Sequence, residues 1–311
     1  MAENILVGVF VLIIGFVMLV KGADWFVDGA AGVARKLGIP QLVIGLTIVA
    51  MGTSLPEAAV SITAAIKQNA GIAVGNVLGS NVLNILIILG LTALITSVAV
   101  QKTTIRIEIP FMLLITLVLL WMGAADGKIS RVEGAILWLF FILYLGYLFF
   151  LTRKQKEEEV QGVQPMWKLL LCIVGGATVI VVGSNLTVNS ATAIARAVGL
   201  SERVIGLTIV ALGTSLPELF TSVTAAQKGN ADIAIGNIVG SNIFNILFVL
   251  GTSALITPLV FEASFWIDGI AAVIAGVVLW LAVVRRKKLM RPWGIVMLVL
   301  YAGYLTYILC V

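Results

Sequence analysis

Residues Val43–Glu57 read VIGLTIVAMGTSLPE, and residues Val204–Glu218 read VIGLTIVALGTSLPE. The two stretches differ only at Met51 and Leu212. The same offset of 161 residues aligns the sequence without a gap from positions 22 and 183 to positions 96 and 257. Chance does not produce self-similarity of this length, so the chain is built from two copies of one unit.

Composition indicates the solvent in which this duplicated unit folds. Of 311 residues, 60% are hydrophobic and 11% are charged, whereas soluble domains have about 45–50% and about 25%. The mean hydropathy is +1.13. These values exclude a water-soluble fold and a disordered chain, because most of the apolar side chains need lipid around them. The net charge of +5 comes from clusters between apolar runs, which does not indicate nucleic-acid binding.

Ten apolar segments are long enough to cross a bilayer. Five segments fall in each copy, and because five is odd the two copies enter the membrane from opposite sides. The predicted fold is an all-α membrane protein of two inverted five-helix repeats, an arrangement typical of secondary transporters. The predicted units are residues 1–152, a polar linker at 153–167, and residues 168–311. The segments are 4–34, 41–66, 72–97, 106–124, 132–151, 168–195, 203–227, 233–257, 264–284 and 292–310.

Loop charges predict the orientation. Fourteen of the twenty Lys and Arg residues lie in one set of alternate connections, which includes the linker, and five lie in the other set. Basic loops stay in the cytoplasm, so we expect an inner (plasma) membrane protein with both termini outside. We further expect it to function as a monomer in the lipid bilayer.

The GTSLPE motifs place a carboxylate inside each of two apolar segments. A charge at this depth costs roughly 2.5–3.5 kcal/mol on insertion scales, and no basic partner recurs beside either acid. Pro56 and Pro217 each leave a carbonyl four residues earlier without its helical donor, so the helix should break there. Hydroxyls share the face of each acid at helical spacing. The residues concerned are Ala50, Thr53, Ser54 and Glu57, with Ala211, Thr214, Ser215 and Glu218 in the second copy.

A second repeated motif, GNxxGSNxxN, follows each GTSLPE. Asn76, Ser80 and Asn84 are spaced by four and form a polar stripe on one helix face. The second copy repeats the stripe at Asn237, Ser241 and Asn245. Interhelical hydrogen bonding is the alternative role for any single asparagine of these stripes.

The available ligand atoms favour a hard cation. The chain has no histidine and two cysteines, Cys172 and Cys310, far apart in sequence, which excludes histidine- and thiolate-based metal sites. Carboxylate, hydroxyl and carbonyl oxygens are ligands for Ca²⁺ or Na⁺. Two carboxylates balance one Ca²⁺ or more than one Na⁺, so the two ions would compete for one site.

The paired motifs, in two inverted copies, resemble the α1 and α2 repeats of the calcium/cation antiporter superfamily, and especially its prokaryotic sodium/calcium exchangers. This resemblance implies a transporter without enzymatic activity or cofactor, in which the first and sixth spans slide as a gating pair. It implies that Glu57 and Glu218 bind Ca²⁺ and Na⁺ and that Thr53 and Thr214 offer carbonyls to Ca²⁺. The implied Na⁺ ligands are Ala50, Ser54, Ser80, Ala211, Ser215 and Ser241, and Asn84 and Asn245 line the centre. Some members carry Asp at the position of Asn245, and its absence argues against K⁺ cotransport.

Alternatives remain at this level. In a Ca²⁺/H⁺ antiporter Glu57 and Glu218 would carry protons, but that branch tends to place further acids in its repeats. A channel is disfavoured by the inverted repeat, and an intramembrane enzyme by the absence of a base beside Ser54 or Ser215. Among other acids, Asp24 and Asp28 are candidates for an ion path or for an interfacial pair with Lys21 or with a loop. Asp268 is expected only to face water.

Overall fold

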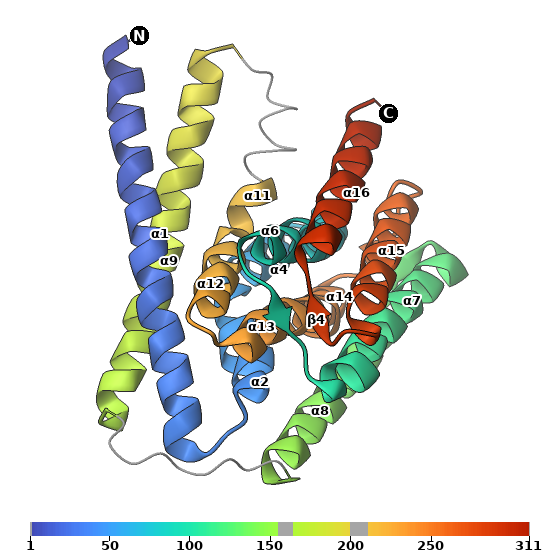
Figure 1. Cartoon of the computed structure of the whole chain (residues 1–311). Helices are drawn as coiled ribbons and strands as arrows, with labels where there is room; N and C mark the ends of the chain where they lie inside the picture. Colours follow the sequence, from blue (N-terminus) through green and yellow to red (C-terminus); the bar gives the residue numbers. More distant parts are fainter. Residues whose placement is uncertain (1, 155–163, 200–210, 311) are drawn as a thin grey trace.

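The computed structural model describes residues 2–154, 164–199 and 211–310, and nearly all of them are helical. Two long helices, α1 (Ala2–Leu37) and α9 (Met166–Ala197), run side by side along one edge of the molecule (Figure 1). The shorter helices form a bundle beside this pair, with the two repeated motifs at its centre (Figure 1).

The elements of the first half follow the predicted order. They are α2 (Gln41–Ile44), η1 (Gly45–Val49), α3 (Ala50–Thr53), α4 (Leu55–Ile66), α5 (Ala70–Leu83), η2 (Asn84–Leu89), α6 (Gly90–Ile95), β1 (Val98–Ala99), η3 (Thr104–Glu108), α7 (Ile109–Asp126), β2 (Lys128–Ile129) and α8 (Arg131–Lys154), where η marks a π-helix.

The second half repeats this order after α9. Its elements are α11 (Ala211–Thr214), α12 (Leu216–Gln227), α13 (Ala231–Phe244), η5 (Asn245–Leu250), α14 (Gly251–Ile256), β3 (Leu259–Val260), α15 (Phe265–Val284), β4 (Lys288–Leu289) and α16 (Arg291–Cys310). The start of the predicted span 203–227 and most of the predicted linker lie outside the described residues.

The membrane-spanning prediction agrees with the helices. Among the described residues, seven helices are long and apolar enough to cross a bilayer, and the pair 41–53 and 55–66 would add one broken span. That pair bends by 52° between Thr53 and Leu55, immediately before Pro56. Ser215 breaks the equivalent helix of the second half, two residues before Pro217. The predicted proline breaks are therefore present in both copies, and the fold is a ten-helix inverted repeat.

Glycines allow α1 and α9 to touch along their backbones. A Cβ added to Gly22 would lie 3.0 Å from the carbonyl oxygen of Gly176, and one added to Gly176 would lie 2.8 Å from that of Gly22. Gly15 and Gly183 form a second such contact one heptad away, with both oxygens at 3.0 Å. Small residues of this kind permit close packing of membrane helices. The two long helices therefore approach each other closely at these glycines.

Two short antiparallel ladders join the halves at opposite ends of α7. Strand β1 pairs with β4, with Val98 opposite Leu289, and β2 pairs with β3, with Ile129 opposite Leu259. Since β1 precedes α7 and β2 follows it, the two ladders lie at opposite ends of this helix. Each ladder takes one strand from each half, so the halves are tied together at both faces.

Candidate cation site

The two repeated glutamates lie where the broken helices meet, and each is bound by a serine of the other half. The Ser54 hydroxyl donates to Glu218 Oε1 at 2.8 Å, and the Ser215 hydroxyl donates to Glu57 Oε1 at 3.2 Å. Glu57 and Glu218 are 1% and 0% exposed. Each serine occupies a helix break and each glutamate follows in the first turn of the next helix. The breaks thus bring two buried carboxylates from opposite halves to one place.

Each carboxylate keeps one oxygen without a partner. Glu57 Oε2 and Glu218 Oε2 accept no hydrogen bond, and neither do the side-chain oxygens of Asn84 and Asn245. A buried acceptor without a donor costs about 1–3 kcal/mol, more when it is charged. Four such oxygens at symmetry-related positions suit a cation, since a cation needs oxygens that donors have not taken.

An asparagine network fixes the direction of the two central amides. Asn81 and Asn242 each donate to the other's backbone carbonyl, at 3.2 and 3.1 Å. Asn84 and Asn245 donate their amide N–H groups to the side-chain oxygens of Asn242 and Asn81, at 3.0 and 3.2 Å. With their donors held in this way, Asn84 and Asn245 keep their oxygens free for another partner. Both also begin π-helices, η2 and η5, and π-turns often occur at functional sites.

The first asparagine of each stripe braces the carboxylate-bearing helix. Asn76 donates to the Glu57 backbone carbonyl and to Ser61, at 3.2 and 2.9 Å. Asn237 donates to the Glu218 carbonyl and to Ser222, at 3.3 and 2.9 Å. Interhelical hydrogen bonding, the alternative weighed for these stripes, is the contact that these two residues make. Their role is to hold the glutamates in place.

The other predicted site residues occupy different surroundings. Thr53 donates to Asn237 at 3.0 Å, and Ser241 donates to the Ala50 carbonyl at 3.4 Å. Thr53, Ala50 and Ser241 therefore lie around the first break. Ser80 lines a cavity between α5, α15 and α16. Thr214 adjoins the second break at the end of α11. Ala211 begins α11, and its side chain lies outside the described residues.

The proline break also frees a carbonyl that a neighbour binds. Pro217 has no N–H for the Gly213 carbonyl, which instead accepts a hydrogen bond from the Ser184 hydroxyl at 2.7 Å. This bond ties α9 to the broken helix in the second half. Position 184 corresponds to Ala23 in the first half, where no hydroxyl is available. The sequence motif indicated the freed carbonyl but not its partner.

Three acids outside the motifs have partners in the structure. Asp24 and Asp28 pair with Lys228, in the loop after α12 of the other half, at 3.2 and 2.7 Å. Of the expected pairings, this is the one with a loop and not the one with Lys21. Asp268 is half-buried and accepts a hydrogen bond from Tyr304 at 2.7 Å, so the expectation that it only faces water was wrong.

Two inverted five-helix repeats that meet at two buried carboxylates define a multi-pass membrane transporter that works by ion antiport. The described residues contain no cluster of three acidic, histidine or cysteine side chains, so neutral oxygens must complete the ligand set. The sequence model described as sodium/calcium exchanger protein matches residues 7–150 and 168–310. The chain belongs to this family of sodium/calcium exchangers.

Individual relatives agree with this assignment. The chain is 40% identical to CaxA of Alkalimonas amylolytica, named as a candidate antiporter, over 96% of this chain and 98% of CaxA. It is 33% identical to the sodium/calcium exchanger MaX1 of Methanosarcina acetivorans, over 97% and 98% of the two chains. A structure of the sodium-calcium exchanger NCX_Mj soaked with Na⁺ and Sr²⁺ superposes with a TM-score of 0.84 at 34% identity, covering 97% of this chain and 98% of that one.

Proposed function

We propose that this chain exchanges Na⁺ for Ca²⁺ across the inner membrane, with both termini outside and one chain as the functional unit. The observation that carries the proposal is the pair of crossed glutamates, each with one oxygen held by a serine of the other half and one oxygen unpartnered. One Ca²⁺ neutralises both carboxylates, and so do two Na⁺. Because both ions need the same oxygens, loading with one displaces the other.

Ca²⁺ and Na⁺ differ in charge and size, so we propose partly different ligands for each. Ca²⁺ would bind both glutamates and the backbone carbonyls of Thr53 and Thr214. Na⁺ would use hydroxyls and carbonyls beside each acid, and the free amide oxygens would close the centre. The proposed Na⁺ and central ligands are Ala50, Ser54, Ser80, Ala211, Ser215, Ser241, Asn84 and Asn245.

Alternating access would come from the long helix pair. The glycine contacts let α1 and α9 lie backbone to backbone, and the ladders hold the opposite part of the bundle together. Movement of the pair across the broken helices would expose the site to one face at a time. The Ser184–Gly213 bond links α9 directly to one break.

The test is Ca²⁺ uptake into Na⁺-loaded proteoliposomes, with pH and membrane potential clamped by ionophores. We expect ⁴⁵Ca²⁺ uptake that requires an outward Na⁺ gradient and is lost in Glu57→Gln and Glu218→Gln. Glu133→Gln is the matched control, since Glu133 only caps α8 by accepting from Ser130 at 2.6 and 2.8 Å. Uptake driven by a pH gradient in the absence of Na⁺ would show proton coupling instead.

A further inference from the structure

Each half contains a second acid that the central site does not use, buried in the first half and half-buried in the second. In the first half the Glu108 carboxylate accepts a hydrogen bond from Tyr147, and in the second half Asp268 accepts one from Tyr304 at 2.7 Å. Glu108 immediately precedes α7 and Asp268 lies in the first turn of α15, and the tyrosines lie on corresponding helices, α8 and α16. The two pairs are therefore copies of one arrangement.

The surroundings of the two acids are also repeated. Thr104 and Ser264 each lie four residues before their acid. The segments YLGYL, starting at Tyr144, and YAGYL, starting at Tyr301, supply two tyrosines each. We call Thr104, Glu108, Tyr144 and Tyr147 the first-half cluster, and Ser264, Asp268, Tyr301 and Tyr304 the second-half cluster.

The first-half cluster is closed and holds three unpartnered oxygens. Thr104, Glu108 and Tyr144 are 0%, 0% and 5% exposed. The Thr104 hydroxyl, the second Glu108 oxygen and the Tyr144 hydroxyl make no hydrogen bond. The ring of Tyr144 stacks beside that of Tyr147, which donates to the acid, with ring centroids 6.4 Å apart. Native proteins rarely leave several polar atoms unsatisfied in one place, so this group indicates a ligand.

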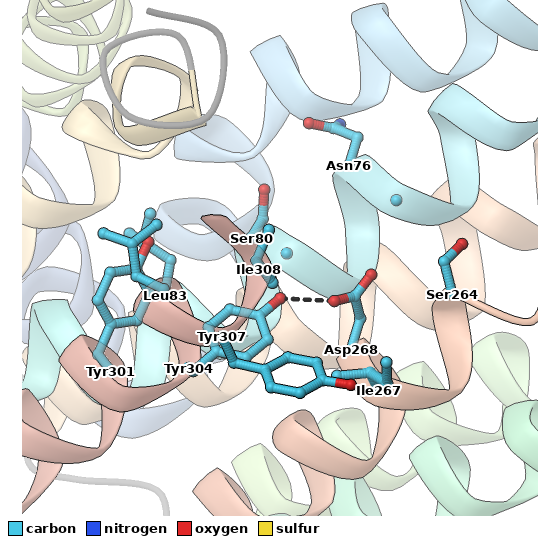
Figure 2. Close-up of a pocket in the computed structure, with 13 residues that line it drawn as sticks. Asn76, Ser80, Leu83, Ser264, Ile267, Asp268, Tyr301, Tyr304, Tyr307 and Ile308 are labelled. Carbon is cyan, nitrogen blue, oxygen red and sulfur yellow. Dashed lines mark hydrogen bonds between the residues drawn. The ribbon is translucent and has the colours of Figure 1, made fainter. Parts of the chain in front are cut away.

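The second-half cluster is open to a cavity of about 540 Å³. Figure 2 shows Tyr304 directed at one oxygen of Asp268, while the other oxygen of Asp268 points away from the tyrosine. The same cavity reaches Ser80 and Asn76 of α5. Its described lining contains no lysine or arginine to neutralise the acid. The cavity therefore connects a half-buried carboxylate to residues of the repeated motif.

The two clusters lie near opposite faces of the membrane. The first-half cluster follows β1, which belongs to one ladder, and the second-half cluster follows β3, which belongs to the other. The ladders lie at opposite ends of α7. One face thus has an open cluster and the other face a closed one in the same conformation.

The charge of each cluster selects the ion. One carboxylate is balanced by one monovalent cation, whereas Ca²⁺ would leave a net positive charge in apolar surroundings, which is costly. We propose that the two clusters are accessory sites for Na⁺, one near each face, where Na⁺ binds on its way to and from the central site. This inference rests on the proposed Na⁺/Ca²⁺ exchange for the identity of the ion.

A binding experiment tests the clusters separately from transport. Purified protein with the central acids removed, Glu57→Gln with Glu218→Gln, is equilibrated with ²²Na⁺. We expect residual ²²Na⁺ binding, which falls to background when Glu108→Gln and Asp268→Asn are added. Both amides keep an acceptor for their tyrosine. Absence of residual binding in the first variant overturns the proposal, even if the intact protein exchanges Na⁺ for Ca²⁺.

Flux measurements test which membrane face each cluster serves. In an otherwise unaltered chain, Asp268→Asn should raise the half-saturating Na⁺ concentration about tenfold on one face, the change expected for one lost charged ligand. Glu108→Gln should do so on the other face. Na⁺-free ⁴⁵Ca²⁺/Ca²⁺ exchange should stay normal in both, which shows that folding is intact. Glu262→Gln, an exposed acid in the same half as Asp268, is the control. Equal losses in Na⁺-dependent and Na⁺-free exchange would refute the assignment.

Discussion

Ser54 donates its hydroxyl to Glu218 across the boundary between the two halves, at 2.8 Å. Ser215 makes the reciprocal bond to Glu57 at 3.2 Å. The central site is therefore not two independent half-sites, because each half orients the acid of the other. A substitution in one motif should therefore change the orientation of the carboxylate in the other motif.

Ser54→Ala should raise the half-saturating Ca²⁺ concentration of exchange by about tenfold, since a hydrogen bond to a charged group contributes roughly 1.5–3 kcal/mol. Ser54→Thr keeps a hydroxyl and should retain most of the affinity. Tracer Ca²⁺/Ca²⁺ exchange in proteoliposomes measures the effect. Wild-type affinity in the alanine variant would show that the bond does not orient Glu218.

The Asn81–Asn242 pair should stabilise the crossing of α5 and α13. Replacing Asn81 with Ala removes a side-chain donor to the buried Asn242 carbonyl and the acceptor of the Asn245 amide, so we expect a loss of about 1–3 kcal/mol. The unfolding temperature of the detergent-purified protein reports this loss. Because the two bonds are reciprocal, the double alanine variant should lose less than the sum of the singles. Strict additivity would argue against a coupled pair.

Asn245→Asp adds a third negative charge to the central site. A bound Ca²⁺ would then leave a net charge that must cross the bilayer interior, so the maximal rate of Ca²⁺/Ca²⁺ exchange should fall about tenfold or more. Acidification should restore part of the rate, because a proton can neutralise the added carboxylate. Asn245→Ser is the neutral control and should show no such pH dependence. An unchanged rate in Asn245→Asp would place Asn245 outside the ion path.

Lys228 pairs with Asp24 and Asp28 of α1. In the other half the equivalent lysine is Lys67, and the positions of the two acids hold asparagines, Asn185 and Asn189. Lys228→Gln should therefore shift the balance of the two access states, while Lys67→Gln should not. Exposed pairs contribute at most about 1 kcal/mol, so the shift should be about two- to fivefold. It should appear as opposite changes in half-saturating Ca²⁺ on the two faces, and should shrink at high ionic strength. Equal effects of the two lysines would contradict this asymmetry.

The sequence was sufficient for the fold class and for both helix breaks, and it selected the candidate site residues, whose roles remain proposals. Exact repetition located both helix breaks, and the isolation of Glu57 and Glu218 from basic residues marked them as candidates for ion binding. These inferences depend on local chemistry along a single segment, such as the missing N–H of Pro56. Such local properties can be inferred from the sequence without knowing how the helices pack.

Partnerships between the halves were not predicted. The repeat aligns Ser54 with Ser215 but does not reveal that each faces the acid of the opposite motif. The two tyrosine clusters were not recognised as repeats of each other, because the offset between the halves changes along the chain. It falls from 161 to 160 at Glu108 and Asp268, and to 157 at Tyr144 and Tyr301. Loop lengths that differ between the halves cause this drift. A search for YxGYL alone would have found the second pair.

The two β-ladders show that the boundary between the two copies of the repeat does not divide the fold into two separate bodies. Each ladder takes one strand from each copy, so evolution has joined the two copies into one body at both membrane faces. The two helices that we propose to move, α1 and α9, also come one from each copy. We therefore expect the fold not to require a covalent link between the halves. Two separately translated halves would find each other through these same strands.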